Sequence, residues 1–281
     1  MDLVAKNKKH YDKLYSEVNI DRMVERVRNL DGFLKDALAT DTSWRGLYLG
    51  GLEKRLAGCK VLELGAGDGL NALVMAALGA DVVAVDISER TPVIVEEAGR
   101  RLGLSERVAG YAADFLTMED FAAESFDLVV GKAFLHHLDH EIEGRFLDKT
   151  AKLLKPGGEA RFLEPATNSP ALDRLRFMVP VPGRPSSLNK AAFTAWEEAD
   201  PHPKRDNSSE HYRQVVARNF RKVDIFCIGS IERLHRLLPK GDANRSFRRL
   251  AFRAEKMLPA RSNEFLARSQ LIVCREPVKG Q

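Results

Sequence analysis

The sequence predicts an α/β fold, in which helices cover both faces of a doubly wound sheet of seven strands. Two observations predict it. Between residues 60 and 165, short apolar runs of strand length alternate with helical patterns, as in parallel βαβ units. The first of these runs, which begins at Cys59, breaks on glycines at 65, 67 and 69 and then becomes helical. That order is typical of a strand, a tight turn and a helix.

Start and stop signals bound most of these elements. A helix is expected over 69–79, with Gly79 as its C-cap, and the next follows Ser88 as N-cap and ends before Gly103. A third covers 140–154 and stops at a Pro-Gly-Gly sequence. The expected strands are 60–64, 81–86, 108–112, 125–133, 157–165, 221–229 and 268–276, and a further helix covers 209–219.

Length and composition indicate one large soluble domain with insertions. The chain has 281 residues and 44% hydrophobic residues, which is ordinary for a globular protein. No apolar run approaches the roughly 20 residues that span a bilayer. The first 15 residues are charged and lack the apolar core of a signal peptide. Three isolated cysteines suit a reducing compartment, so a cytoplasmic location is expected.

Charge is distributed unevenly along the chain. Residues 1–150 hold 19 Lys/Arg and 26 Asp/Glu, a balance of −7, whereas residues 151–281 hold 25 and 14, a balance of +11. The basic half favours an anionic substrate, an acidic lipid surface or nucleic acid, or it consists of ordinary solvated helix faces. The sequence leaves these readings open.

The glycine turn is the strongest candidate for a ligand site. Its spacing is G-x-G-x-G, not the G-x-G-x-x-G typical of dinucleotide-binding proteins. Glu63 precedes the first glycine by two residues and would repel a pyrophosphate but suit a cation. Asp86 ends the next strand about 20 residues later, where a carboxylate can accept the ribose hydroxyls of an adenosine.

With these residues the chain resembles the class I S-adenosylmethionine-dependent methyltransferases of the small-molecule type, whose first motif is an acid followed by G-x-G-x-G. The LLKPGG sequence before the fifth strand is similar to that family too. The resemblance implies a Rossmann-like sheet of seven strands, S-adenosyl-L-methionine as cofactor, and an antiparallel last pair of strands. It covers residues 59–165 strongly and 209–276 weakly.

The resemblance also implies roles for individual residues. The turn packs along the methionine part of the cofactor, Asp114 and its neighbour hold the adenine, and Gly131 admits the amino-acid end. The expected cofactor-binding residues are Tyr11, Glu63, Gly65, Ala66, Gly67, Asn71, Asp86, Ile87, Asp114, Phe115 and Gly131.

The same resemblance divides the chain. Residues 1–56 are expected to form a helical lid over the cofactor and 57–165 the cofactor-binding core. Residues 166–208, proline-rich and basic, would cap the strand ends. Residues 209–281 would complete the core, with a basic helical insertion at about 231–265 that departs from the simplest family pattern.

Three residues are the candidates for catalysis. His136 and His137 follow the fourth strand, whose carboxyl end should open on the active site. An imidazole can take a proton from a hydroxyl at neutral pH. Glu164 ends the neighbouring fifth strand and could orient one histidine. The alternative is that one or both histidines brace the loop. No metal-ligand cluster is recognised in the sequence.

The prediction is therefore methyl transfer to a small molecule, O-methylation first, in natural-product or lipid and isoprenoid metabolism. C- or N-methylation of an anionic isoprenoid or lipid is the alternative. More distant ones are an NAD-dependent oxidoreductase and a non-catalytic basic binding protein. No nucleic-acid partner is expected, since the chain lacks the NPPY and Pro-Cys motifs of DNA methyltransferases. Peripheral membrane contact and homo-oligomerisation are left open.

Overall fold

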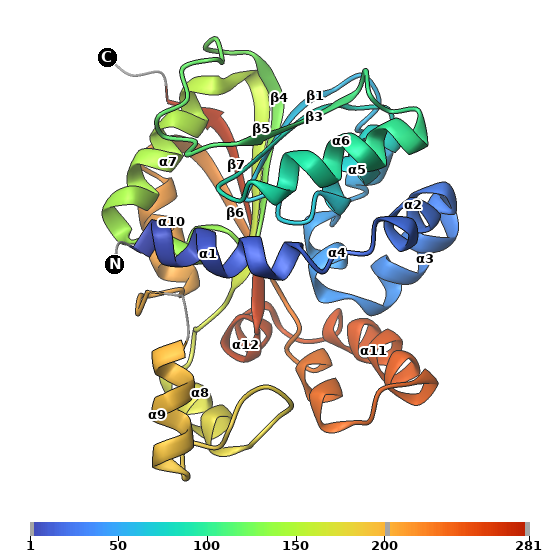
Figure 1. Ribbon diagram of the computed structural model, residues 1–281. Helices are drawn as coiled ribbons and strands as arrows, with labels where there is room; N and C mark the ends of the chain where they lie inside the picture. Colours follow the sequence, from blue (N-terminus) through green and yellow to red (C-terminus); the bar gives the residue numbers. More distant parts are fainter. Residues whose placement is uncertain (1–2, 200–202, 279–281) are drawn as a thin grey trace.

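The computed structural model describes residues 3–199 and 203–278, and shows an α/β sheet with helices on both faces (Figure 1). The sheet has seven strands in the order β3-β2-β1-β4-β5-β7-β6. All pairings from β3 to β5 are parallel, and β7 lies antiparallel between β5 and β6. The strands are β1 Lys60–Leu64, β2 Asp81–Asp86, β3 Val108–Ala112, β4 Phe126–Lys132, β5 Leu154–Pro165, β6 Phe220–Ile228 and β7 Ser269–Pro277.

Two apolar layers form because strand side chains alternate between the faces of the sheet. In β1, Val61 packs against the layer that contains α2 to α6, whereas Leu62 and Leu64 face α7 and α10. The helices of the first layer are α2 Ile20–Arg28, α3 Leu30–Thr40, α4 Thr42–Leu47, α5 Leu70–Ala77 and α6 Arg90–Leu102. Those of the second are α7 His140–Leu153 and α10 Ser209–Val216. The sequence predicted this fold class, the parallel core and the antiparallel last pair.

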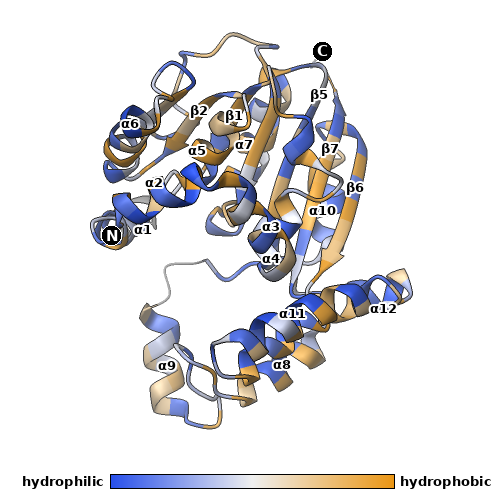
Figure 2. Cartoon of the chain, turned by 90° about the vertical axis from the view of Figure 1, so that its right-hand side faces the viewer, coloured by the Kyte–Doolittle hydropathy of each residue, from blue (hydrophilic) through white to orange (hydrophobic). Residues whose placement is uncertain are grey.

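The regions outside the core are helical, as predicted. Helix α1, Leu3–Tyr15, crosses the molecule at the carboxyl ends of the parallel strands, while the cap and the insertion gather below the sheet (Figures 1 and 2). The cap holds α8 Pro170–Met178 and α9 Lys190–Ala199. The insertion holds η3 Glu232–Leu237, α11 Asp242–Glu255 and α12 Ala260–Leu266, and short turns η1 Leu52–Lys54 and η2 Leu135–His137 complete the set. Among the described helices, none combines the length and apolar character that crossing a bilayer requires.

Two element boundaries differ from expectation. Strand β5 begins at Leu154, before the Pro-Gly-Gly sequence, with a register irregularity against β4. Helix α6 begins at Arg90 with Glu89 as N-cap, not Ser88. The Ser88 hydroxyl still accepts the Arg90 N–H at 3.2 Å and also donates to Asp12 of α1 at 2.6 Å, while the Ser88 backbone N–H donates to Asp86. The side chain that the local sequence marks as a cap thus joins α1 to the first turn of α6.

The third glycine of the turn is required by packing. Gly69 is the N-cap of α5 with φ of +75°, and a Cβ added there would lie 2.4 Å from the Cγ2 of buried Val95. Gly103, the C-cap of α6, has a similar φ of +69° but open space around it.

We expect Gly69→Ala to lower the free energy of unfolding more than Gly103→Ala. Both substitutions incur left-handed backbone strain of about 1–2 kcal/mol. Only Gly69→Ala adds the clash with Val95, a further 1–3 kcal/mol or so. Urea denaturation of both variants measures the difference, and equal losses would contradict the packing role.

Candidate active site

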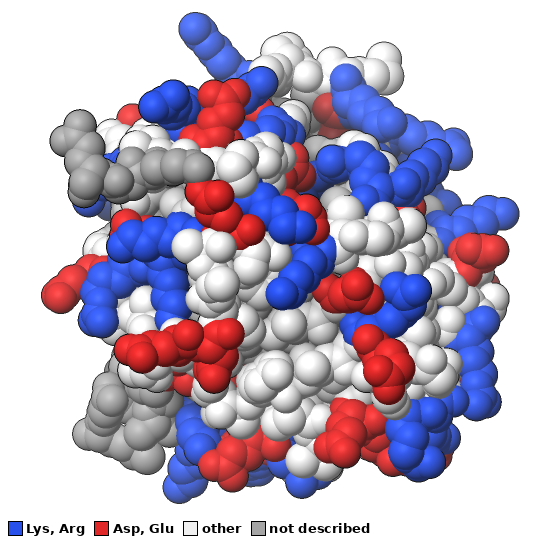
Figure 3. All heavy atoms as spheres, turned by 90° about the horizontal axis from the view of Figure 1, so that it is seen from above, with Lys and Arg blue, Asp and Glu red and all other residues white. Residues whose placement is uncertain are grey.

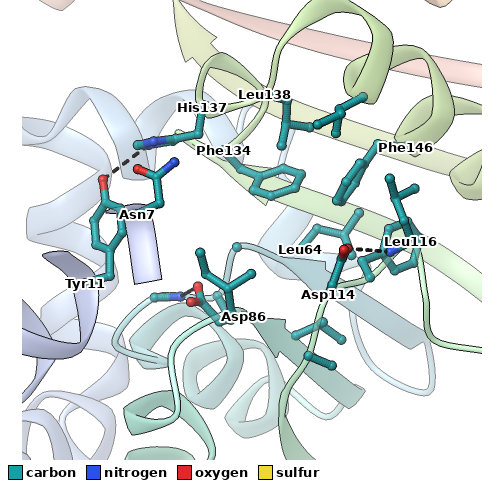
Figure 4. Close-up of a pocket in the computed structure, with 18 of the residues that line it drawn as sticks. Asn7, Tyr11, Leu64, Asp86, Asp114, Leu116, Phe134, His137, Leu138 and Phe146 are labelled. Atoms are coloured by element: carbon teal, nitrogen blue, oxygen red, sulfur yellow. Dashed lines mark hydrogen bonds between the residues drawn. The ribbon is translucent and has the colours of Figure 1, made fainter. Parts of the chain in front are cut away.

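A cavity of about 700 Å³ opens at the carboxyl ends of β1, β2 and β4, a size typical of ligand sites. Its wall is mostly apolar, with a few polar groups directed inward. Figure 4 shows Asn7, Tyr11 and His137 on one side of it, and Asp114 and Phe146 on the other. Of the predicted site residues, the cavity is lined by Tyr11, Gly65, Ala66, Gly67, Asp86, Ile87, Asp114, Phe115, His136 and His137.

The first two glycines of the turn let the backbone pack closely against aromatic residues that border the cavity. Gly65 and Gly67 have φ of +64° and +62°. A Cβ on Gly65 would lie 2.5 Å from the Phe134 ring, and one on Gly67 would lie 3.0 Å from the Tyr15 hydroxyl. Side chains would therefore displace the aromatic residues that border the cavity. This cradle fits a ligand that runs close along the backbone.

Two acids stand at successive strand ends around the cavity. Asp86 accepts the N–H of Gly67 at 2.8 Å and that of Ser88 at 2.9 Å, so each oxygen has one partner and acceptor capacity remaining. Burial raises the pKa of the Asp86 carboxyl, while its backbone donors oppose that shift. Asp114 accepts the N–H of Leu116 at 2.9 Å. These positions suit the ribose hydroxyls and the adenine amino group of an adenosine.

Helix α1 closes one side of the cavity. The Asp12 carboxylate accepts from the Ser88 hydroxyl and, at 3.0 Å, from the Glu89 N–H, which ties α1 to the loop after β2. Tyr11 contacts the His137 Nε2 at 3.3 Å, and Asn7, 6% exposed, lines the same side. The Asn7 Oδ1 has no hydrogen-bond partner among the described residues. An unsatisfied buried oxygen in the wall fits a polar ligand group.

The Glu164 carboxylate organises the turn after β4. It is 1% exposed and accepts the backbone N–H groups of Phe134 at 3.0 Å and Leu135 at 2.7 Å. Its other oxygen lies 2.7 Å from the His136 Nδ1 and 3.3 Å from the His136 N–H. A carboxylate at Nδ1 holds the imidazole in one orientation and favours Nε2 as the proton acceptor. The structure thus pairs the acid with one of the two predicted histidines.

Three predicted cofactor contacts lie outside the cavity wall. Glu63, 1% exposed, points behind the turn and accepts from the Asn71 amide at 2.7 Å, and Asn71 in turn accepts from the Tyr48 hydroxyl. A Cβ on Gly131 would meet the Phe162 ring at 2.9 Å, so this glycine makes room for core packing. None of Glu63, Asn71 and Gly131 lines the cavity, so their contact with the cofactor stays a prediction.

A group of three metal-type ligands forms elsewhere, which the sequence did not indicate. His140, Glu143 and His211 bring their side-chain atoms within 4.8 Å of one another. The buried Arg205 guanidinium lies 2.6 Å from Glu143 and 3.1 Å from the His211 Nε2. Since this cation already neutralises Glu143, the group is an ion-pair network that anchors the segment before α10.

Aromatic residues that sequence reasoning missed complete the wall. Phe134 and Phe146 lie with ring centroids 5.2 Å apart, and the ring of Phe115, a predicted site residue, is tilted against Phe146 with centroids 5.1 Å apart. Lys132 lines the cavity with its Nζ 4.7 Å from the Trp44 ring centroid. Phe134 follows the left-handed Ala133 directly after β4, but a single aromatic residue at a strand end carries no distinct sequence signal.

The strand order, the glycine turn and the two acids resemble those of class I S-adenosylmethionine-dependent methyltransferase domains. Comparison with known proteins agrees. Residues 61–158 match the family model described as "Methyltransferase domain". The chain is 39% identical over 120 residues to a ubiquinone biosynthesis O-methyltransferase of Xanthomonas oryzae pv. oryzae, covering 41% of this chain and 46% of that protein.

A second curated relative is a demethylmenaquinone methyltransferase of Clavibacter sepedonicus, 37% identical over 112 residues, which are 40% of this chain and 43% of that protein. The chain thus matches less than half the length of these two relatives. A SAM-dependent methyltransferase structure from Archaeoglobus fulgidus shares the fold, with a TM-score of 0.51 and 18% identity over 80% of this chain and 93% of that one.

Burial of Glu63 predicts a distinctive pH dependence of stability. Burial raises its pKa from 4.5 to about 7, although Lys132 and Asn71 favour the charged form. A raised folded pKa means that the folded state binds the extra proton, so stability falls as pH rises from about 4.5 to 7. Glu63→Gln removes this titration.

We therefore expect the free energy of unfolding of Glu63→Gln, relative to wild type, to rise by up to about 3 kcal/mol as the pH increases from about 4 to 8. Urea denaturation across that range measures the change. Glu106→Gln, an exposed control, should follow the wild-type curve. A constant difference between Glu63→Gln and wild type would contradict the assigned cause.

Proposed function

We propose that this protein transfers a methyl group from S-adenosyl-L-methionine to a hydroxyl of a small molecule. The observation that carries the proposal is the arrangement of the cavity wall. The glycine turn, Asp86 and Asp114 suit an adenosine and its attached chain, and His136, paired with Glu164, reaches the same cavity. One wall thus combines cofactor-binding groups with a base.

The chain's own residues have separate tasks in this proposal. Bound S-adenosylmethionine supplies an electrophilic methyl group. Asp86 accepts the ribose hydroxyls, Asp114 accepts the adenine amino group, and the turn at 65–67 positions the adjoining chain. Helix α1 covers the site through Tyr11 and Asn7 and excludes water from it. Alignment of the reacting atoms contributes much of the rate in such a transfer.

His136 is the proposed general base. Its Nδ1 is held by Glu164, so Nε2 is the nitrogen that would take the proton from the acceptor hydroxyl as the new bond to oxygen forms. Glu164 is a positioning residue, and it also stabilises the imidazolium that results. His137, whose Nε2 contacts the Tyr11 hydroxyl, instead links the turn to the lid.

The relatives support oxygen as the acceptor atom and a quinol-like compound as the acceptor. One relative is named for O-methylation in ubiquinone biosynthesis and another for demethylmenaquinone methylation. By analogy with them we propose an aromatic or isoprenoid-linked small molecule as the substrate. Methylation at carbon is the second candidate, favoured by the second relative.

Cofactor binding is tested by calorimetry with S-adenosylhomocysteine. We expect saturable binding that Asp86→Asn weakens by roughly tenfold to a hundredfold, because hydrogen bonds to a charged group contribute about 1.5–3 kcal/mol. Asp81→Asn, at the exposed start of the same strand, should bind normally. Binding of NAD in place of S-adenosylhomocysteine would overturn the proposal.

The base is tested by transfer of a labelled methyl group to a panel of phenols and quinols. We expect His136→Ala to lower kcat by about 10²–10⁴ and Glu164→Gln to shift the pH profile of kcat, with affinity for S-adenosylhomocysteine retained. His140→Ala, exposed and outside the cavity wall, is the control. An unchanged kcat in His136→Ala would remove this residue from the mechanism.

A further inference from the structure

Five arginines of the cap, the insertion and the start of β7 lie near enough for their charges to interact, with Arg184 bonded to the Arg176 carbonyl and Arg268 to Glu232 of η3. The arginine cluster consists of Arg176 on α8, Arg184 on the following loop, Arg233 and Arg236 on η3, and Arg268 just before β7. The Arg236 guanidinium is repelled by the charges of Arg176, Arg184 and Arg268. The Arg233 guanidinium is repelled by those of Arg176 and Arg268. Segments up to 92 residues apart in sequence thus bring like charges together.

The cluster lies at the same edge of the sheet as the cofactor cavity. Pro165 at the end of β5 pairs with Ser269 at the start of β7, which pairs with Ile228 at the end of β6. The segments that carry the cluster leave from these three positions. In the parallel half, β1 and β4 end at this edge beside the cavity. Ligands of open α/β sheets bind outside this edge.

Too few carboxylates face the cluster to neutralise it. The acids that act on it are Asp173 and Glu232. Asp173 lies 3.4 Å from Arg176. Glu232, fully buried, already pairs with Arg268 at 2.9 Å and with Arg248, outside the cluster, at 2.7 Å. Among the described residues, five guanidinium groups face these two carboxylates, which leaves three positive charges without a facing acid.

Of the remaining arginines, Arg184 lies over the Phe177 ring with its Cζ 5.1 Å from the ring centroid, and none has a carboxylate partner among the described residues. Arg184, 8% exposed, donates to the Arg176 and Val179 carbonyls at 2.6 and 3.0 Å, but its Nε has no acceptor among the described residues. Arg233 donates to the Leu266 carbonyl at 2.8 Å. Over the described part of the chain, the structure records no hydrogen bond or ion pair for the solvent-accessible Arg236. Guanidinium donors therefore remain available to an anion.

Electrostatics at the cluster are consistent with an anion site. Partial burial and the neighbouring arginines lower the pKa of Arg236 to about 10, and those of Arg184 and Arg233 are lowered by the same causes. In contrast, the opposite end of the molecule shows Lys/Arg and Asp/Glu interspersed (Figure 3). A bound anion would relieve the repulsion that the fold maintains here.

We propose that the arginine cluster binds a phosphate or diphosphate group of the methyl acceptor. A phosphate ester carries nearly two negative charges at neutral pH, which suits the three unbalanced positive charges better than one carboxylate does. Planar guanidinium groups bind its oxygens in pairs.

Apolar residues on the two helical segments would contact the body of such a molecule. Leu175 and Met178 on α8, and Leu234 and Leu237 on η3, are 45–62% exposed. That an anion binds here is inferred from the arginine cluster alone. That the anion belongs to the methyl acceptor rests on the proposed function.

The test is calorimetric titration of the full-length protein with inorganic pyrophosphate. We expect saturable binding with one site per chain, weakened at least tenfold by Arg236→Gln and less by Arg236→Lys, which keeps the charge but not the planar fork. Arg253→Gln is the matched control, because Arg253 is an exposed arginine of α11 outside the cluster. It should bind within twofold of wild type. Absence of saturable binding, or equal loss in Arg253→Gln, would overturn the proposal.

Vesicles containing phosphatidic acid distinguish the source of the phosphate. Flotation with vesicles that depends on Arg236 but not Arg253, and that pyrophosphate inhibits, would support a lipid headgroup at the same site. Pyrophosphate binding without flotation would support a water-soluble acceptor. Flotation that depends equally on both residues, without pyrophosphate binding, would mean a diffuse basic surface and overturn the site. S-adenosylhomocysteine binding on the same samples separates this result from failure of the proposed function.

Discussion

The Glu164 carboxylate is the interaction on which the geometry of the active site depends. It is buried at the end of β5, yet its oxygens accept three backbone N–H groups and one imidazole nitrogen from the turn after β4. A buried carboxylate is stable only with such a set of donors. Because the acid and the turn come from adjacent strands, the register between β4 and β5 positions the imidazole.

The two halves of the sheet carry different segments of the site and its surroundings. The parallel half, from β3 to β4, ends in the glycine turn and the two acids, and it is the part that the methyltransferase domain model matches. The half with β5, β7 and β6 carries the cap and the basic insertion. The segment that matches the methyltransferase domain model thus lines most of the cavity, and the cap and the insertion lie outside the matched residues.

Most of the cofactor site was predictable because its signals are local. A glycine with positive φ or an acid at a strand end is required by the backbone within a few residues, so Gly65, Gly67, Asp86 and Asp114 could be placed in advance. The side of the turn on which Glu63 lies could not be predicted, because alternation along a strand fixes which face a residue takes only once the sheet's two faces are known. Its burial behind the turn, against Asn71, depends on helix packing that no motif records.

By itself, the sequence determined the α/β fold and the order of its elements, since hydrophobic periodicity and turn residues act over short stretches of chain, while its resemblance to the methyltransferases indicated the class of cofactor. Only the tertiary structure decided which histidine meets Glu164, that Asn7 on α1 reaches the cavity, and that Arg176, Arg233 and Arg268 come together. These contacts join segments tens of residues apart or more, and their energies depend on burial and distance, which exist only once the chain has folded.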